Sequence, residues 1–139
     1  VGQPNGPSKL CLSCHDGTVA IENHSGNTSG TYYSSFGNLG TNLGNDHPIS
    51  FQYTSVLAVA DGELHDPSTT LSGLVGTIQD DLLYNGNLEC TSCHDPHISR
   101  NTGGCIGCHN IHGGKFITIT LSLRKSNENS TLCLTCHDK

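Results

Sequence analysis

The sequence predicts a mostly irregular, loop-rich fold with a few short helices and one small β-hairpin-like pairing of strands. The first observation behind this prediction is the apolar content, which is 33% of 139 residues, with three Phe, four Tyr and no Trp. Globular domains typically contain about 45–50% apolar residues when glycine is counted. The second is the length, which favours a single domain over residues 1–139. Together they leave too few apolar side chains for a sizeable core.

The first predicted elements are short and follow one another along the chain. Residues 1–10 read as an arm that contains Gly and Pro, and residues 25–46 read as a loop because Gly, Ser, Thr and Asn dominate them. Ile49, Phe51 and Tyr53 alternate with other residues, which predicts a short strand.

Helical turns and a second strand are expected further along. Residues 55–60 and 79–83 each suit one or two helical turns. Apolar side chains alternate with Thr and Ser over residues 117–123, which predicts a strand able to pair with the first one. Residues 126–129 supply N-cap side chains for a short helix near the C-terminus.

Eight cysteines form four CxxC pairs, and a histidine follows each pair directly. The four motifs are Cys11-Leu-Ser-Cys14-His15, Cys90-Thr-Ser-Cys93-His94, Cys105-Ile-Gly-Cys108-His109 and Cys133-Leu-Thr-Cys136-His137. CxxCH is the attachment motif of haem c. Two thiols at this spacing add to the two vinyl groups of one porphyrin, and the next imidazole is held at the iron as an axial ligand. The sequence therefore predicts four haems c (Fe), whose apolar plates would form the core of the fold.

Zinc sites and disulfides are the alternative interpretations of CxxC pairs. Neither of them requires a histidine after every second cysteine, so the haem interpretation is favoured.

The axial ligands divide into two groups. The motif histidines His15, His94, His109 and His137 occupy one position on each iron. Methionine is absent, which excludes His/Met ligation and predicts bis-histidine haems of low potential. The candidates for the second position are His24, His47, His65, His97 and His112, one more than four irons need. His97 and His112 each stand three residues after a motif histidine, so we expect each to serve a neighbouring haem.

Charge and hydropathy restrict the partners. The net charge is −6 with His neutral, which argues against nucleic-acid binding. No apolar run approaches the ~18 residues of a membrane span. Covalent haem attachment takes place after export, so we expect an export signal to have been removed ahead of Val1. The expected location is extracellular or at the cell surface, with the periplasm as the alternative.

The motifs and the segments around them resemble multihaem c-type cytochromes with doubled CxxCH motifs. The segments that carry the resemblance are CLSCHDGTVA, NDHPISFQY, LECTSCHDPH and LRKSNENSTLCLTCHDK. Within that group the chain is most similar to the tetrahaem subunits of OmcE-like extracellular cytochrome nanowires. That resemblance implies a head-to-tail homopolymer in which one haem takes a histidine from the adjacent subunit. His24 or His65 would be the crossing ligand.

Three functions are compatible with these observations. The first is electron conduction by a polymer of this subunit, with redox proteins or extracellular acceptors as partners. The second is a soluble periplasmic electron shuttle. The third is a multihaem reductase, which needs an iron with an open position. Because the histidine supply closes every iron, we expect no enzyme and no catalytic residue.

Overall fold

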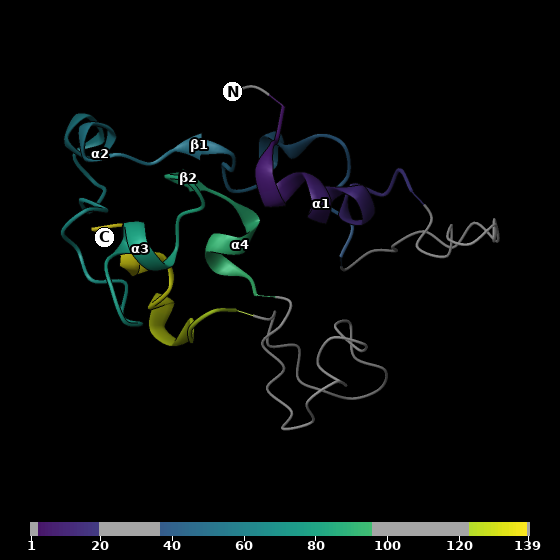
Figure 1. The fold of residues 1–139 in the computed structure, drawn as a ribbon. Helices are drawn as coiled ribbons and strands as arrows, with labels where there is room; N and C mark the ends of the chain where they lie inside the picture. The colour runs from purple at the N-terminus through teal and green to yellow at the C-terminus, as the bar shows by residue number, and fades with distance from the viewer. Residues whose placement is uncertain (1–2, 20–36, 96–122, 139) are drawn as a thin grey trace. The chain divides into compact units, whose positions relative to one another are not determined.

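The computed structural model describes residues 3–19, 37–95 and 123–138 (Figure 1). The chain divides into two compact units, Val1–Phe51 and Gln52–Lys139, and each is described by itself. Residues 117–122 of the predicted strand over residues 117–123 lie outside the described residues, as does part of the predicted loop over residues 25–46. Figure 1 shows short helices joined by irregular segments, which confirms the predicted loop-rich fold class.

Among its described residues, 3–19 and 37–51, the first unit has one α-helix, α1 (Gly6–His15). The prediction of an arm over residues 1–10 is therefore wrong from Gly6 onward. Pro7 lies in the first turn of α1, where the missing proline N–H breaks no intrahelical hydrogen bond. Leu12 and Ser8 of this helix are buried. A 3-10 turn, η1 (Leu43–Asn45), follows later in the unit.

The two predicted helical segments of the second unit are confirmed as α2 (Ser55–Asp61) and α3 (Ile78–Asp81). The Thr54 side chain caps α2 by accepting the Leu57 N–H at 3.2 Å. Thr77 and Asp80 form a reciprocal capping box at α3. Such caps satisfy N–H groups that a helix leaves without partners at its start.

The predicted strand around Phe51 is confirmed as β1 (Phe51–Gln52), and its described partner is β2 (Asn87–Leu88) in a two-stranded antiparallel sheet. This partner was not predicted. A tight turn precedes it, in which Tyr84 and Asn87 exchange two backbone hydrogen bonds of 2.9 Å. Asn85 and Gly86 carry φ angles of 50° and 77°, the positive values of the hairpin turn that Asn-Gly favours.

The described part of the second unit holds three further short helical elements: α4 (Cys90–Cys93), the 3-10 turn η2 (Glu128–Ser130) and α6 (Cys133–Cys136). The expectation that residues 126–129 supply the N-cap of the short helix near the C-terminus is wrong, because the N-cap of α6 is Leu132 and no side chain caps the helix. The Leu132 N–H instead donates at 3.1 Å to the Oδ1 of Asn127. This side chain holds the turn that leads into α6.

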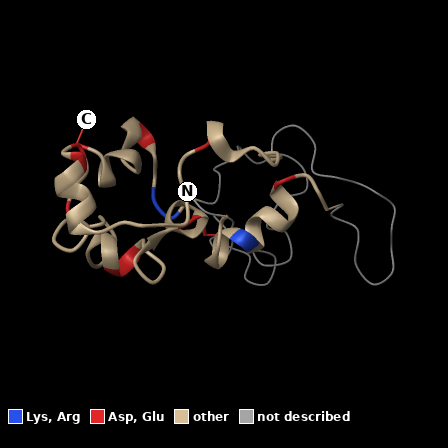
Figure 2. Ribbon diagram, turned by 90° about the horizontal axis from the view of Figure 1, so that it is seen from above, with Lys and Arg blue, Asp and Glu red and all other residues tan. Residues whose placement is uncertain are grey.

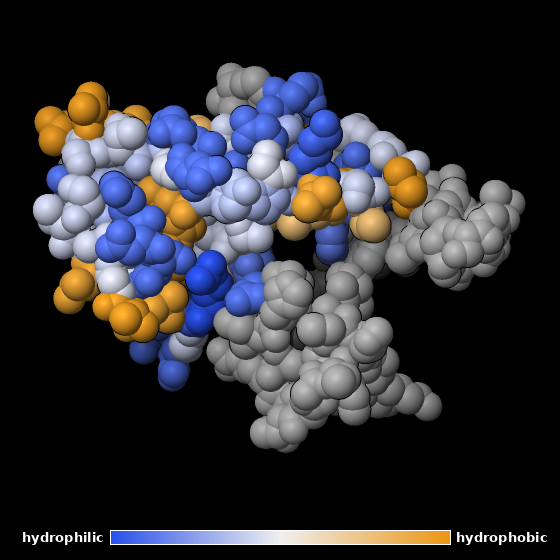
Figure 3. Space-filling model, viewed as in Figure 1, coloured by the Kyte–Doolittle hydropathy of each residue, from blue (hydrophilic) through white to orange (hydrophobic). Residues whose placement is uncertain are grey.

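The apolar core of the described residues is small. In the second unit the buried hydrophobic side chains are Tyr53, Ala58, Ile78, Leu82, Leu88 and Leu132. Large apolar side chains remain on the surface (Figure 3), among them Leu10 at 77% and Val75 at 97% exposure. The described helices are all too short or too polar to cross a membrane.

Charged side chains are sparse and mostly acidic in the described segments (Figure 2). The basic residues among them are Lys9, Arg124 and Lys125. Two of these three follow one another in the chain, which concentrates positive charge at one position of the second unit.

Candidate haem-attachment sites

The second and fourth CxxCH motifs have the same local structure. In each, the four residues from cysteine to cysteine form one helical turn, α4 or α6. The histidine that follows is extended, with φ/ψ of −110°/137° at His94 and −105°/140° at His137. Its N–H donates to the carbonyl of the first cysteine, at 2.9 Å and 3.1 Å respectively. Cysteines three apart in a helical turn lie on one face, as two thioether bonds to one porphyrin require.

A leucine pairs with each of these two histidines across a short antiparallel bridge. Leu64 lies opposite His137, and Leu123 lies opposite His94. Side chains that face each other across an antiparallel pair lie on the same side of it. Each leucine side chain therefore lies on the same side of its bridge as the histidine of the motif.

The bridges are anchored in the same way in both motifs. The residue after each leucine donates its N–H to the carbonyl of the second motif cysteine, His65 to Cys136 and Arg124 to Cys93, both at 2.9 Å. His65 and Arg124 thus occupy equivalent positions. Because side chains alternate along an extended segment, the His65 side chain lies on the opposite side of the bridge from His137.

Tyr53 secures the fourth motif. Its side chain is 3% exposed, and its hydroxyl donates to the His65 carbonyl at 2.6 Å and lies 3.4 Å from the Cys136 carbonyl. Burial raises the pKa of Tyr53 well above its usual value of 10, and the neighbouring Cys136 and Asp66 act in the same direction. The hydroxyl therefore stays protonated and remains a donor.

The first motif is held differently. Cys11, Cys14 and His15 all lie in α1. The His15 Nδ1 lies 2.7 Å from the Gly37 carbonyl oxygen, and the His15 carbonyl accepts the Leu39 N–H at 2.7 Å. Because a carbonyl oxygen only accepts, Nδ1 carries the proton and the neutral ring has its lone pair on Nε2. Such a bond to the outer nitrogen orients a metal-ligating imidazole.

His47 shows the same tautomer. Its Nδ1 lies 2.9 Å from the Pro48 carbonyl oxygen, and the residue is exposed. The lone pair is therefore on Nε2, the form that an axial ligand needs. His65 is half-buried beside the fourth motif.

The second and fourth motifs lie close together within the second unit. Arg124 N–H bonds the Cys93 carbonyl at 2.9 Å, and the next residue, Lys125, bonds the Thr135 hydroxyl at 2.8 Å through Nζ. Two consecutive residues thus connect the two motifs. The Cys133 and Cys93 sulfurs are near enough to affect each other electrostatically.

Burial disfavours the thiolate form of the second cysteine in each of these two motifs. Burial is the main cause that raises the pKa of Cys93, and burial raises that of Cys136 to about 11. None of the six described cysteines forms a disulfide. A thioether carries no charge, so it suits a sulfur position whose surroundings disfavour a thiolate.

The residues around the motifs fit a porphyrin. Leu10 precedes Cys11 and is 77% exposed, and Leu39 and Leu134 are also exposed although they adjoin motif residues. A porphyrin plate attached at these cysteines would cover such side chains and supply the apolar contacts that the small core lacks. Across residues 3–19, 37–95 and 123–138, no group of three or more His, Cys, Asp or Glu is arranged to hold a bare metal ion.

The structure describes eleven of the predicted site residues and leaves six outside. The described ones are Cys11, Cys14, His15, His47, His65, Cys90, Cys93, His94, Cys133, Cys136 and His137. Those that lie outside the described residues are His24, His97, Cys105, Cys108, His109 and His112. The assignment of a distal histidine to each haem stays a prediction.

Sequence reasoning missed the residues that hold the motifs. Leu64 and Leu123 form backbone bridges with the motif histidines, and Tyr53 bonds the fourth motif, but no local pattern marks these roles. The Asn85-Gly86 dipeptide was overlooked. Asn-Gly is a strong indicator of a tight hairpin turn, so it would have predicted the turn before β2.

Comparison with known proteins agrees with this geometry. A family profile described as the doubled CXXCH motif matches residues 99–139, a segment that holds the third and fourth motifs. No curated protein matches the chain. The doubled CXXCH motif indicates covalently bound c-type haem and supports placing the chain among the multihaem c-type cytochromes.

Proposed function

We propose that this chain transfers electrons through four covalently attached bis-histidine haems c. The observation that carries the proposal is the common structure of the second and fourth motifs, together with the two-residue connection between them through Arg124 and Lys125. Attachment sites so close would hold two haems within electron-transfer distance of each other. Each haem, when bound, supplies one-electron Fe(III)/Fe(II) chemistry.

The chain attaches each haem, orients its axial ligands and excludes water from it. The cysteine pairs fix each porphyrin by its edge. The bonds that Gly37 makes to His15, and Pro48 to His47, set the tautomer of two axial ligands. Leu64 and Leu123 pair with the backbone of two further axial histidines, His137 and His94, and fix the course of the chain there. None of these roles requires an open iron position, so we propose a carrier and not an enzyme.

We further propose that the chain is the repeating subunit of an extracellular conductive filament. The resemblance to OmcE-like nanowire subunits supports this assembly, in which His24 or His65 would ligate a haem of the adjacent copy. Two apolar side chains of α2, Val56 and Val59, are 79% and 82% exposed, and an assembly would bury such surface. A soluble periplasmic shuttle is the alternative, and it would use the same four haems.

The haem count is tested by the intact mass of the purified holoprotein, which should equal the chain plus four haems. A Cys11→Ser, Cys14→Ser double variant should lose one haem. The matched control is Ser13→Ala in the same motif, because Ser13 is exposed and lies between the two cysteines; it should keep all four. A wild-type mass with fewer haems, or a double variant that loses none, would overturn the assignment.

The spin state of the irons tests the bis-histidine ligation, and electron microscopy tests the filament. The ferric holoprotein should be entirely low-spin, and His47→Ala should convert one haem to high-spin. A high-spin haem in the resting wild type would favour an enzyme. Negative-stain images should show filaments, whereas a dispersed monomer at high concentration with every iron six-coordinate would replace the filament by the shuttle.

A further inference from the structure

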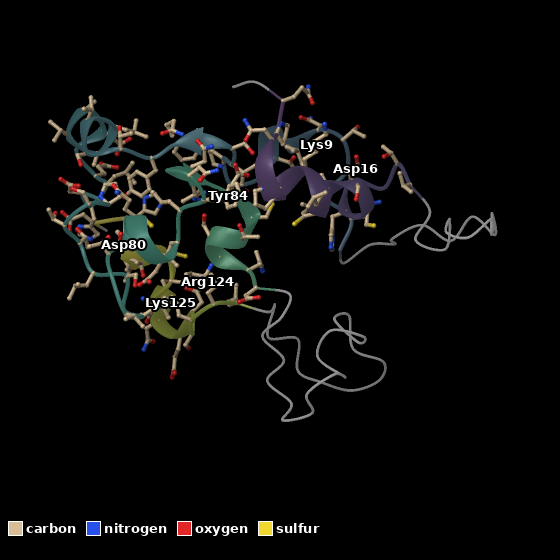
Figure 4. The ribbon with its side chains drawn as sticks, in the orientation of Figure 1. Lys9, Asp16, Asp80, Tyr84, Arg124 and Lys125 are labelled. Carbon is tan, nitrogen blue, oxygen red and sulfur yellow. The ribbon has the colours of Figure 1, made fainter. Side chains whose placement is uncertain are left out.

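Lys125 lies at the junction of the second and fourth motifs (Figure 4). Its ammonium donates to the Thr135 hydroxyl and to the Ser72 carbonyl, each at 2.8 Å. Thr135 is the residue between Leu134 and Cys136, so it lies inside the fourth CxxCH motif. Both acceptors are uncharged, so these bonds fix the position of the ammonium without neutralising its charge.

The site that holds Lys125 is built into the fold. Ser72 is fully buried and Thr135 is 7% exposed. The Thr135 hydroxyl also donates to the Thr131 carbonyl at 2.9 Å, which orients its oxygen toward the lysine. Gly73 has φ of +80°, and a Cβ there would lie 2.7 Å from Nζ. The glycine therefore leaves room for the ammonium at this point.

The field of this ammonium reaches the haem-attachment position. Lys125 Nζ lies 2.8 Å from the Thr135 hydroxyl, and Thr135 directly precedes Cys136, whose sulfur would attach the haem. In the holoprotein this sulfur is a thioether to the porphyrin edge, so it marks where the macrocycle begins. Lys125 therefore acts on that edge across the single turn of α6.

We propose that Lys125 sets the reduction potential of the haem attached at Cys133 and Cys136, and raises it. Reduction adds one electron and no proton to the iron, so a fixed positive charge stabilises the ferrous state relative to the ferric state. Neighbouring charge is one of the levers by which a protein tunes a haem potential. The inference rests on the proposed haem attachment at the fourth motif.

The test is an optical redox titration of the holoprotein, fitted with four one-electron steps. Lys125→Gln should lower one midpoint potential, with a change of about tenfold in the reduced-to-oxidised ratio, or ~59 mV for a one-electron couple. That size follows from a unit charge acting across about the width of a helix in surroundings of intermediate dielectric. Lys125→Arg retains the charge and should restore the wild-type potential.

Two controls separate charge from structure. Thr135→Val removes the hydrogen bond to the lysine but keeps the charge, so all four potentials should stay near those of the wild type. In a Cys133→Ser, Cys136→Ser background without the fourth haem, Lys125→Gln should have a much smaller effect on the remaining haems. An equal effect with and without that haem would show that Lys125 acts elsewhere.

The outcomes distinguish this inference from the proposed function. If the wild-type holoprotein carries no haem at Cys133 and Cys136, the proposed function fails. If four haems are bound and Lys125→Gln leaves every midpoint unchanged, only the role of Lys125 fails. A Thr135→Val shift as large as that of Lys125→Gln would assign the effect to packing and overturn the electrostatic role.

Discussion

Replacing Tyr53 by Phe tests whether the fourth motif is held by the contact that joins it to the start of the second unit. The ring is almost fully buried, and phenylalanine retains its apolar contacts. The change removes only the hydroxyl, which donates to the His65 carbonyl at 2.6 Å and lies 3.4 Å from the Cys136 carbonyl. The variant therefore isolates one hydrogen bond between segments distant in the chain.

The expected cost is that of one neutral hydrogen bond, about 0.5–1.5 kcal/mol. His65 is half-buried, so water can reach part of its surroundings and replace some of the lost bonding. We therefore expect the free energy of unfolding to fall by about 1 kcal/mol, which corresponds to a Tm lower by roughly 3–5 °C for a chain of this size.

Chemical denaturation of the holoprotein, followed by circular dichroism, measures this free energy. Tyr84→Phe is the matched control, because Tyr84 is 50% exposed and should change stability by less than about 0.5 kcal/mol. Hydrogen exchange adds a local readout, since the His65 N–H that donates to Cys136 should exchange faster in Tyr53→Phe. If the two variants are equally stable and His65 exchange is unchanged, the hydroxyl does not hold the motif.

Three further predictions concern stability. Ile78→Ala empties a fully buried position of α3 and should lower the free energy of unfolding by about 2–5 kcal/mol in urea denaturation. Gly86→Ala forces a side chain to φ of 77° and places a Cβ 3.1 Å from Gln52 Oε1, so it should lower Tm at a cost of about 1–2 kcal/mol; an unchanged Tm would contradict the turn. Asp81 accepts hydrogen bonds from Ser72 and from backbone N–H groups, which lower its pKa below 3.8. Its contribution is present above that value and is lost as pH falls through the lower folded-state pKa. Acid titration of Tm should accordingly show a smaller loss below pH ~4 in Asp81→Asn than in the wild type.

Local signals predicted much of the fold, and long-range pairing was the part they missed. The helical turns at α2 and α3 were predictable because apolar spacing lies within a few residues. The helix α1 (Gly6–His15) was missed because Gly and Pro near its first turn resemble a loop. The pairing of β1 with β2 was missed because it joins Gln52 to Asn87, 35 residues apart.

The attachment chemistry of this chain was determined by sequence alone. Two cysteines three residues apart and the histidine that follows specify a haem c motif locally, since one helical turn is enough to place both sulfurs on one face. Only the tertiary structure showed which contacts fix each motif in place. Tyr53 approaches Cys136 from 83 positions away, and the two leucines reach their histidines through backbone pairing that no short window contains. Cofactor attachment is a property of local spacing, whereas the position of each haem site and of the charge beside it depends on contacts between distant segments.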